Sequence, residues 1–128
     1  MVVIVIVAIL AAVAVPLYLN YVKDAQRTEA KGAMGAVITA EQANFQKLGA
    51  YEPGATSQDV ETKLGIDLGD AKANWNFKVE LGSTDPGKEG FVITASANVA
   101  RAGMKDVGDV TYTYSRDPNS QPDSPWTP

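Results

Sequence analysis

One stretch of this sequence matches the first seven positions of a phosphate-binding P-loop. Its residues are Gly82-Ser83-Thr84-Asp85-Pro86-Gly87-Lys88. In a P-loop, the glycines let backbone N–H groups surround the phosphates, and the lysine contacts them. Glu89, however, stands where a serine or threonine should bind magnesium, and the next residues predict a strand instead of the required helix. We therefore predict a hairpin loop with an Asp-Pro-Gly turn and no cofactor.

Oxygen-bearing side chains near the C-terminus alternate with other residues, as they do in a calcium-binding loop. They are Asp117, Asn119, Gln121 and Asp123. Pro122 occupies the place of the glycine that such a loop needs, and no glutamate follows to supply the bidentate ligand. We predict no metal site in this segment.

The residue types of the sequence do not indicate a catalytic site. The sequence contains no histidine and no cysteine, and no serine lies in a G-x-S-x-G elbow. Asp67 and Asp70 are close enough in sequence to serve as an acid and base pair, but scattered surface carboxylates are far commoner. We predict no catalytic residue and no enzymatic activity.

The strongest feature of the chain is its apolar N-terminus. Residues 1–19 carry no charge and no polar side chain except that of Tyr18, and the first charge is at Lys23. As a helix, the 22 residues before Lys23 would extend about 33 Å, enough to cross the hydrocarbon of a membrane. Two other interpretations stay open, a cleaved secretory signal and the buried core helix of a soluble domain.

The length of the chain limits the rest of the molecule to one small domain, the head, and its charge limits the partners that it can bind. The 128 residues suffice for one compact domain of about 80 to 100 residues with an appended helix. The net charge is −4, and residues 49–128 contain seven bases and twelve acids. An acidic head disfavours binding to a phosphate backbone, so no direct nucleic acid partner is expected.

Helical periodicity continues from the apolar segment through residues 23–48, where two stripes run along the predicted helix. The small stripe contains Tyr18, Val22, Ala25, Glu29, Gly32, Ala36, Ala40 and Ala43, and the bulky stripe contains Met34, Val37, Ile38, Phe45 and Leu48. We expect the bulky stripe to cover the head core and the small stripe to allow close approach of other helices. Lys47 and Gly49 predict that the helix ends near Leu48.

The remaining residues predict a short helix and an antiparallel sheet. The helix should span residues 58–64, capped by Thr56 or Ser57 and ended by Gly65. Period-two alternation predicts strands at 75–81, 91–97 and 110–115, and the proline-rich tail 117–128 should form no regular ladder bonds. The fold class is therefore α+β, with an apolar half-helix that protrudes from a head containing about three strands.

This organisation divides the chain into four parts and defines a predicted core. The parts are a hydrophobic segment (1–22), an amphipathic helix (23–48), a loop-and-sheet region (49–116) and the tail (117–128). The predicted head core contains Met34, Val37, Ile38, Phe45, Leu48, Trp75, Phe77, Val79, Phe91, Ile93, Tyr112 and Tyr114.

Residues 1–30, MVVIVIVAILAAVAVPLYLNYVKDAQRTEA, closely resemble the N-terminal helix of bacterial type IV pilins and of the related type II secretion pseudopilins. The shared features are the Val/Ile run, the LAAVAVP block ending at Pro16, the aromatic Tyr18 and Tyr21, and the passage into an Ala-rich helix. The later loop and strands fit the architecture of the family without a motif that we can match.

The resemblance implies a lollipop-shaped subunit that is stored in the inner membrane and polymerised by an assembly machine into a helical filament on the cell surface. Its partners would be other copies of the chain, the inner membrane and that machinery. The residues expected to pack in the filament core are Val2, Val3, Ile4, Val5, Ile6, Val7, Ala8, Ile9, Leu10, Ala11, Ala12, Val13, Val15, Leu17, Tyr18 and Tyr21.

Pro16 is the expected helix break. It lacks a backbone donor and its ring clashes with the carbonyl of Ala12, and pilin helices are often unwound around this proline, so we expect irregular backbone near residues 11–16. Members of the family also carry a glutamate that pairs with the N-terminus of a neighbouring subunit. No residue of this sequence matches that glutamate, and we assign the role to none.

Two alternatives to a surface filament subunit stay open. A pseudopilin or minor pilin would share the anchor but form a short periplasmic piston. A single-span membrane-anchored binding module would need a ligand pocket, which no strand segment indicates.

Overall fold

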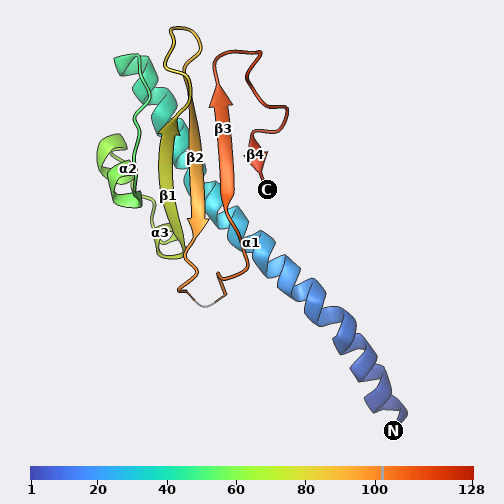
Figure 1. Cartoon of the computed structure of the whole chain (residues 1–128). Helices are drawn as coiled ribbons and strands as arrows, with labels where there is room; N and C mark the ends of the chain where they lie inside the picture. The colour runs from blue at the N-terminus through green and yellow to red at the C-terminus, as the bar shows by residue number, and fades with distance from the viewer. Residues whose placement is uncertain (102) are drawn as a thin grey trace.

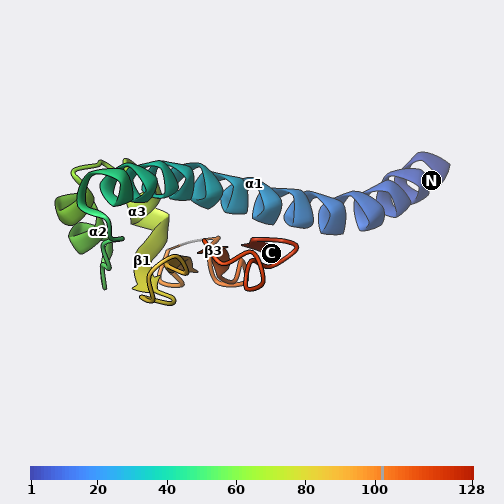
Figure 2. The ribbon, with the colours of Figure 1, turned by 90° about the horizontal axis from the view of Figure 1, so that it is seen from above.

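The computed structural model describes residues 1–101 and 103–128, and it consists of one long helix and a small head (Figure 1). Helix α1 (Val2–Leu48) is followed by α2 (Ser57–Leu64), α3 (Ala71–Asn74), β1 (Trp75–Leu81), β2 (Gly90–Ala97), β3 (Val110–Ser115) and β4 (Trp126–Thr127). The distal half of α1 lies across one face of the sheet, and its other half projects from the head (Figure 2). The predicted α+β class and protruding helix are confirmed.

Local sequence signals determine where the helices end. Gly49 adopts the left-handed conformation (φ 73°), and its N–H donates to the carbonyl of Phe45 at 2.7 Å, which ends α1 as predicted. In α2, the hydroxyl of Thr56 accepts a hydrogen bond from the N–H of Asp59, and Gly65 ends the helix. The predicted short helix is therefore confirmed. The four-residue α3 lies in a segment where we expected a loop.

The sheet is an antiparallel meander of order β1-β2-β3-β4. The three predicted strands are confirmed, with β2 one residue longer at Gly90. The expectation that the tail forms no ladder bonds is wrong for Trp126 and Thr127, which pair with Tyr112 and Thr111. Its prolines do not prevent this pairing, because Pro125 contributes a carbonyl, which accepts the N–H of Thr113 at 2.9 Å.

The hairpin between β1 and β2 contains the segment that matches a P-loop. Asp85 accepts a hydrogen bond from the N–H of Lys88 at 3.0 Å, and Gly87 between them has φ 82°. Pro86 followed by a glycine with positive φ is typical of a tight turn. The predicted Asp-Pro-Gly turn is confirmed, and β2 follows it where a P-loop would need a helix.

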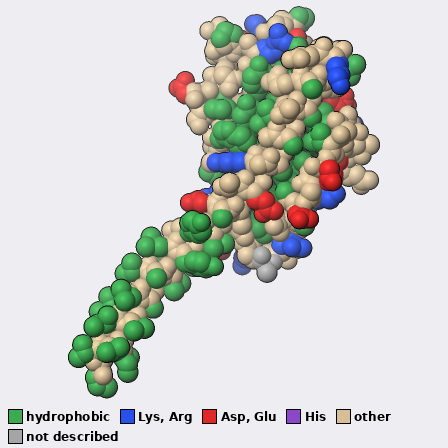
Figure 3. All heavy atoms as spheres, turned by 180° about the vertical axis from the view of Figure 1, so that it is seen from behind, with side chains coloured by type: hydrophobic (Ala, Val, Ile, Leu, Met, Phe, Trp, Pro, Cys, Tyr) green, Lys and Arg blue, Asp and Glu red, His purple; other side chains and the backbone are tan. Residues whose placement is uncertain are grey.

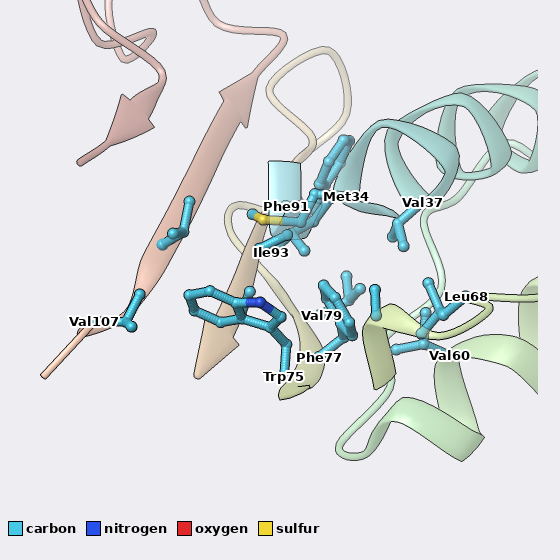
Figure 4. Close-up of a cluster of buried hydrophobic side chains, with 14 of the residues drawn as sticks. Met34, Val37, Val60, Leu68, Trp75, Phe77, Val79, Phe91, Ile93 and Val107 are labelled. Atoms are coloured by element: carbon cyan, nitrogen blue, oxygen red, sulfur yellow. The ribbon is translucent and has the colours of Figure 1, made fainter. Parts of the chain in front are cut away.

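One face of the sheet and one face of α1 form the core (Figure 4). Alternation along the strands directs Trp75, Phe77 and Val79 of β1 inward. Phe91 and Ile93 of β2 are buried on the same face, with Ile93 directly opposite Val79. The helix contributes Ala30, Met34 and Val37, all fully buried. Partly buried side chains that pack against this cluster include Ile38, Phe45, Tyr112 and Tyr114. Buried hydrophobic residues that the sequence did not predict are Ala30, Tyr51, Val60, Leu68, Ala71, Ala95, Met104, Val107 and Val110.

Leu48 is the predicted core residue that does not belong there, since its side chain is 72% exposed. The chain turns back at Gly49, and Tyr51 then enters the core, where its ring stacks on Phe45 with centroids 4.7 Å apart. Tyr51 therefore covers the end of the core that periodicity assigned to Leu48. Burial raises the pKa of the Tyr51 hydroxyl to about 12.

Gly90 provides a test of the packing between β2 and β3. A Cβ atom at Gly90 would overlap the carbonyl oxygen of Tyr114 on the paired strand. We expect Gly90→Ala to lower the free energy of unfolding by about 2 kcal/mol, because a rigid backbone contact must shift. Denaturant titration of the chain in detergent micelles would measure the change.

Gly82→Ala is the matched control for this substitution. Its Cβ would meet the backbone of Gly90 at 3.5 Å, an ordinary contact, and Gly82 does not have a positive φ. We expect the control to be neutral or slightly stabilising. Equal effects of the two substitutions would show that the close approach at Gly90 does not limit stability.

Candidate functional site

The protruding part of α1, residues 2–22, is the most unusual surface of the molecule, and we call it the stalk. An 18-residue window of this helix has a mean hydropathy of 3.0 and no buried residue. Hydrophobic side chains cover it in Figure 3. By length and composition alone, the helix could cross a membrane. A soluble monomer rarely exposes an apolar surface this large, so the stalk needs another environment.

Every residue predicted to pack in a filament core lies exposed on this stalk. Val2, Val3 and Ile4 are 69–72% exposed, and the alanines at 8, 11 and 12 are exposed as well. Other exposed members are Val5, Ile6, Val7, Ile9, Leu10, Val13, Val15, Leu17, Tyr18 and Tyr21. From Val2 to Tyr21, every residue of the stalk is therefore exposed to partners outside the subunit.

The predicted helix break at Pro16 is not present in the structure, where α1 is helical from Val2 to Leu48. Proline removes one backbone donor, so the carbonyl of Ala12 loses its partner four residues on. The neighbouring turns keep their hydrogen bonds, which suffices to keep the helix continuous in a single subunit. The helix curves gently instead (Figure 2).

The small stripe of α1 stays open along the back of the head. Ala25, Gly32, Ala36 and Ala43 are exposed, whereas Val22, Glu29 and Ala40 are half-buried. A Cβ atom at Gly32 would meet nothing within 4 Å. The stripe continues the stalk as a smooth helical face, on which another helix can approach closely.

Arg27 fastens the stalk to the head. Its Nε and Nη2 atoms donate to the carbonyl oxygen of Val107 at 3.1 and 2.8 Å, and Nη1 donates to Asp24 at 3.3 Å. Glu29 provides a second link, because its carboxylate accepts a hydrogen bond from Asn74 Nδ2 at 3.3 Å. These contacts join residues far apart in sequence, so no local pattern indicates them. They set the direction in which the stalk leaves the head.

Glu41 is a functional candidate that the sequence analysis missed. Its side chain is fully buried between α1 and the segment after Gly49. Oε2 accepts a hydrogen bond from the N–H of Glu52 at 2.9 Å, whereas Oε1 has no hydrogen-bond partner within the protein. The sequence signal was present, because Glu41 lies four residues after Val37 and four before Phe45 on the face that packs against the head.

Burial raises the pKa of Glu41 to about 7, against an ordinary value of 4.5. The hydrogen bond from Glu52 N–H acts in the opposite direction, and the nearby carboxylate of Glu52 adds a smaller upward effect. Glu52 in turn lies 3.8 Å from the Nζ atom of Lys63.

The C-terminal segment that has the spacing of a calcium loop forms internal hydrogen bonds instead. Asp117 accepts hydrogen bonds from the N–H of Asn119 and the hydroxyl of Ser120. Gln121 accepts the N–H of Ser115 at 2.7 Å. Among the described residues, no group of three acidic, histidine or cysteine side chains is placed to hold a metal ion. Asp67, the other candidate carboxylate, accepts a hydrogen bond from Gly69 N–H, which lowers its pKa.

A small α+β head on a protruding helix that is long and apolar enough to cross a membrane defines the class of subunit to which this chain conforms. The sequence agrees with this class: it is 31% identical over 123 residues to fimbrial protein Q of Moraxella bovis, covering 91% of this chain and 74% of that protein. The chain belongs to the type IV pilin family. No protein-family model matches the chain. No solved structure matches it.

The raised pKa of Glu41 predicts that acid stabilises the head. The carboxyl group binds a proton more tightly when folded (pKa about 7) than when unfolded (4.5), so the stabilisation is complete below pH 4.5 and is lost as pH rises through 7. We expect this group to lower the free energy of unfolding by up to about 3 kcal/mol across that window. Denaturant titrations of the chain in detergent at a series of pH values would measure it.

Glu41→Gln removes the titrating group while keeping the shape of the side chain. We expect the pH dependence between 4.5 and 7 to become flatter in this variant. Glu80→Gln, at an exposed carboxylate on β1, is the matched control and should keep the slope of the parent chain. An unchanged slope in Glu41→Gln would refute the assignment.

Proposed function

We propose that this chain is a structural subunit that polymerises into an extracellular type IV pilus filament through packing of its stalk. The observation that carries the proposal is the complete exposure of an apolar helix whose window has no buried residue. Fimbrial protein Q, by its name, is a component of fimbriae, and this supports a structural, non-enzymatic role. Before assembly, the stalk would hold the subunit in the inner membrane, from which an assembly machine would extract it.

Polymerisation replaces one apolar environment of the stalk by another. In the membrane, residues 2–22 contact lipid tails, and in a filament they would contact the same segments of other copies. Because lipid tails are as apolar as valine or isoleucine, the exchange has little hydrophobic cost and depends on close packing. Ala8 and Ala12, four residues apart, provide small positions where helix backbones can approach.

A pseudopilin or minor pilin is the second candidate function, because it would use the same stalk to form a short piston. The fimbrial relative favours a surface filament. A membrane-anchored binding module is a third possibility from another class, since a hollow of about 750 Å³ lies beside α2 and β1. Its lining contains Lys72, but the Nζ atom of this residue is 3.3 Å from Glu61, so its charge is already paired.

A charge in the middle of the stalk tests the packing model. We expect Ile6→Asp or Val13→Asp to abolish filaments, since a buried carboxylate without a partner is too costly in an apolar core. Both positions are exposed in the isolated subunit, so the head should fold as before. Electron microscopy of sheared surface material, from cells that carry a pilus assembly machinery, would measure filament number and length.

Ile6→Leu and Thr84→Asp are the controls. The first keeps the stalk apolar, and the second places the same new charge on an exposed residue of the hairpin. Both should give normal filaments. Normal filaments from either stalk variant would contradict the model, and short or absent filaments from the unaltered chain would favour the pseudopilin alternative.

A further inference from the structure

The connection between β2 and β3 meets α1 where the stalk leaves the head. Arg27 holds the carbonyl of Val107, and a Cβ atom at Gly103 would lie 3.4 Å from Gln26. A cleft of about 340 Å³ separates the two segments and is lined by Leu19, Val22, Lys23, Gln26, Gly103, Lys105 and Asp106. Figure 1 shows this connection at the end of the sheet nearest the stalk.

Helix length places this part of the head at the height of a membrane surface. A helix needs about 20 apolar residues to cross the hydrocarbon layer, and an apolar run of at least that length precedes Lys23. Lys23, the first charge of the chain, would then lie among the lipid headgroups. Because Lys105 lines the same cleft as Lys23, it would lie at that height too. We call the exposed Val99, Arg101 and Lys105, together with the half-buried Lys23 beside them, the basal surface.

The basal surface differs in charge from the remainder of the molecule. Lys23, Arg101 and Lys105 make no ion pair with any described residue, whereas Arg27 is paired with Asp24. The other acids of the region are Asp106 and Asp109. With Glu29, which accepts a hydrogen bond from Asn74 beside this connection, the region has four bases and four acids, and the rest of the chain has seven bases and eleven acids. A surface of balanced charge, in which three bases make no ion pair with a described residue, therefore lies beneath an acidic head.

Apolar and aromatic side chains adjoin these bases. Val99 is 66% exposed in the β2–β3 connection, two residues before Arg101. Tyr18 and Tyr21, on the stalk, are 65% and 71% exposed. Tyrosines at the two ends of a membrane span are typical of the interface, where the ring is buried and the hydroxyl reaches water. Lysine and arginine side chains extend from apolar surface to phosphates in the same way.

We infer that the basal surface docks on anionic phospholipid headgroups while the stalk spans the membrane. Lys23, Arg101 and Lys105 would contact lipid phosphates, and Val99 would enter the interface between them. Three basic side chains alone would bind anionic lipid only weakly. The stalk, however, holds the head beside the membrane, so the local concentration of lipid headgroups is high. This inference rests on the membrane-anchored stage of the proposed function.

A depth measurement tests the inference on the full chain. The sequence has no cysteine, so Val99→Cys provides a single labelling site. In vesicles that contain phosphatidylglycerol, a fluorophore at this position should be quenched by spin-labelled headgroups, and less so in phosphatidylcholine alone. Adding Lys105→Gln should reduce the docked population about fivefold, since one charge near an anionic surface is removed. Lys105→Arg should preserve docking.

Three controls separate the possible failures. Lys88→Gln changes an exposed lysine on the β1–β2 hairpin and should leave the quenching of the Val99 label unchanged. A label at Thr84→Cys, on the same hairpin, should not be quenched. A label at Val7→Cys, with spin labels in the acyl chains, reports whether the stalk is inserted.

The quenching of the Val99 and Val7 labels distinguishes the docking inference from the membrane-anchored stage on which it rests. Quenching at Val99 that depends on phosphatidylglycerol and on Lys105 supports docking on lipid. A quenched Val7 label with an unquenched Val99 label, or Val99 quenching that is equal in both lipids, would overturn the inference and leave the proposed function intact. An unquenched Val7 label would overturn the membrane-anchored stage and, with it, this inference.

Discussion

The mismatch between the length of α1 and the size of the sheet is the constraint on which the structure depends. A helix of 47 residues extends about 70 Å, whereas the longest strand, with eight residues, extends about 26 Å. The sheet can therefore bury one face of the distal half of α1 and nothing of the stalk. An apolar helix left in this way must be surrounded by lipid or by other helices. The membrane anchoring and the self-assembly that we propose both rest on this single geometric fact.

The head controls the direction of the stalk through a few long-range contacts. Arg27 binds the carbonyl of Val107, and Glu29 accepts a hydrogen bond from Asn74, so the β2–β3 connection and the start of β1 are attached to neighbouring residues of the helix. On the other side, Lys31 lies over the ring of Trp126, with 5.7 Å between its Nζ atom and the ring centroid. The tail thus joins the sheet and the helix. The head is therefore attached to α1 at several separate points.

A buried carboxyl group between α1 and the rest of the head makes the stability of the head depend on pH. Glu41 enters the core at the point where the chain returns from Gly49, and its hydrogen bond to Glu52 holds that return segment on the helix. Burial raises the pKa of this carboxyl group into the neutral range. Protonation of this one group is therefore expected to stabilise the head, whereas the stalk carries no ionisable side chain apart from those of Tyr18 and Tyr21. Stability of the head and packing of the stalk respond to different conditions.

The sequence alone determined the features that depend on neighbouring residues. The apolar run indicated the stalk, Thr56 and the glycines at 49 and 65 determined the helix ends, and alternation located three strands, because caps and periodicity are local. Tertiary structure decided which positions of those patterns are buried. It placed Tyr51 where Leu48 was expected, buried Glu41, and paired Trp126 with Tyr112. These outcomes depend on where the chain turns back and which strand edge is open, and such contacts between distant segments leave no periodic signal.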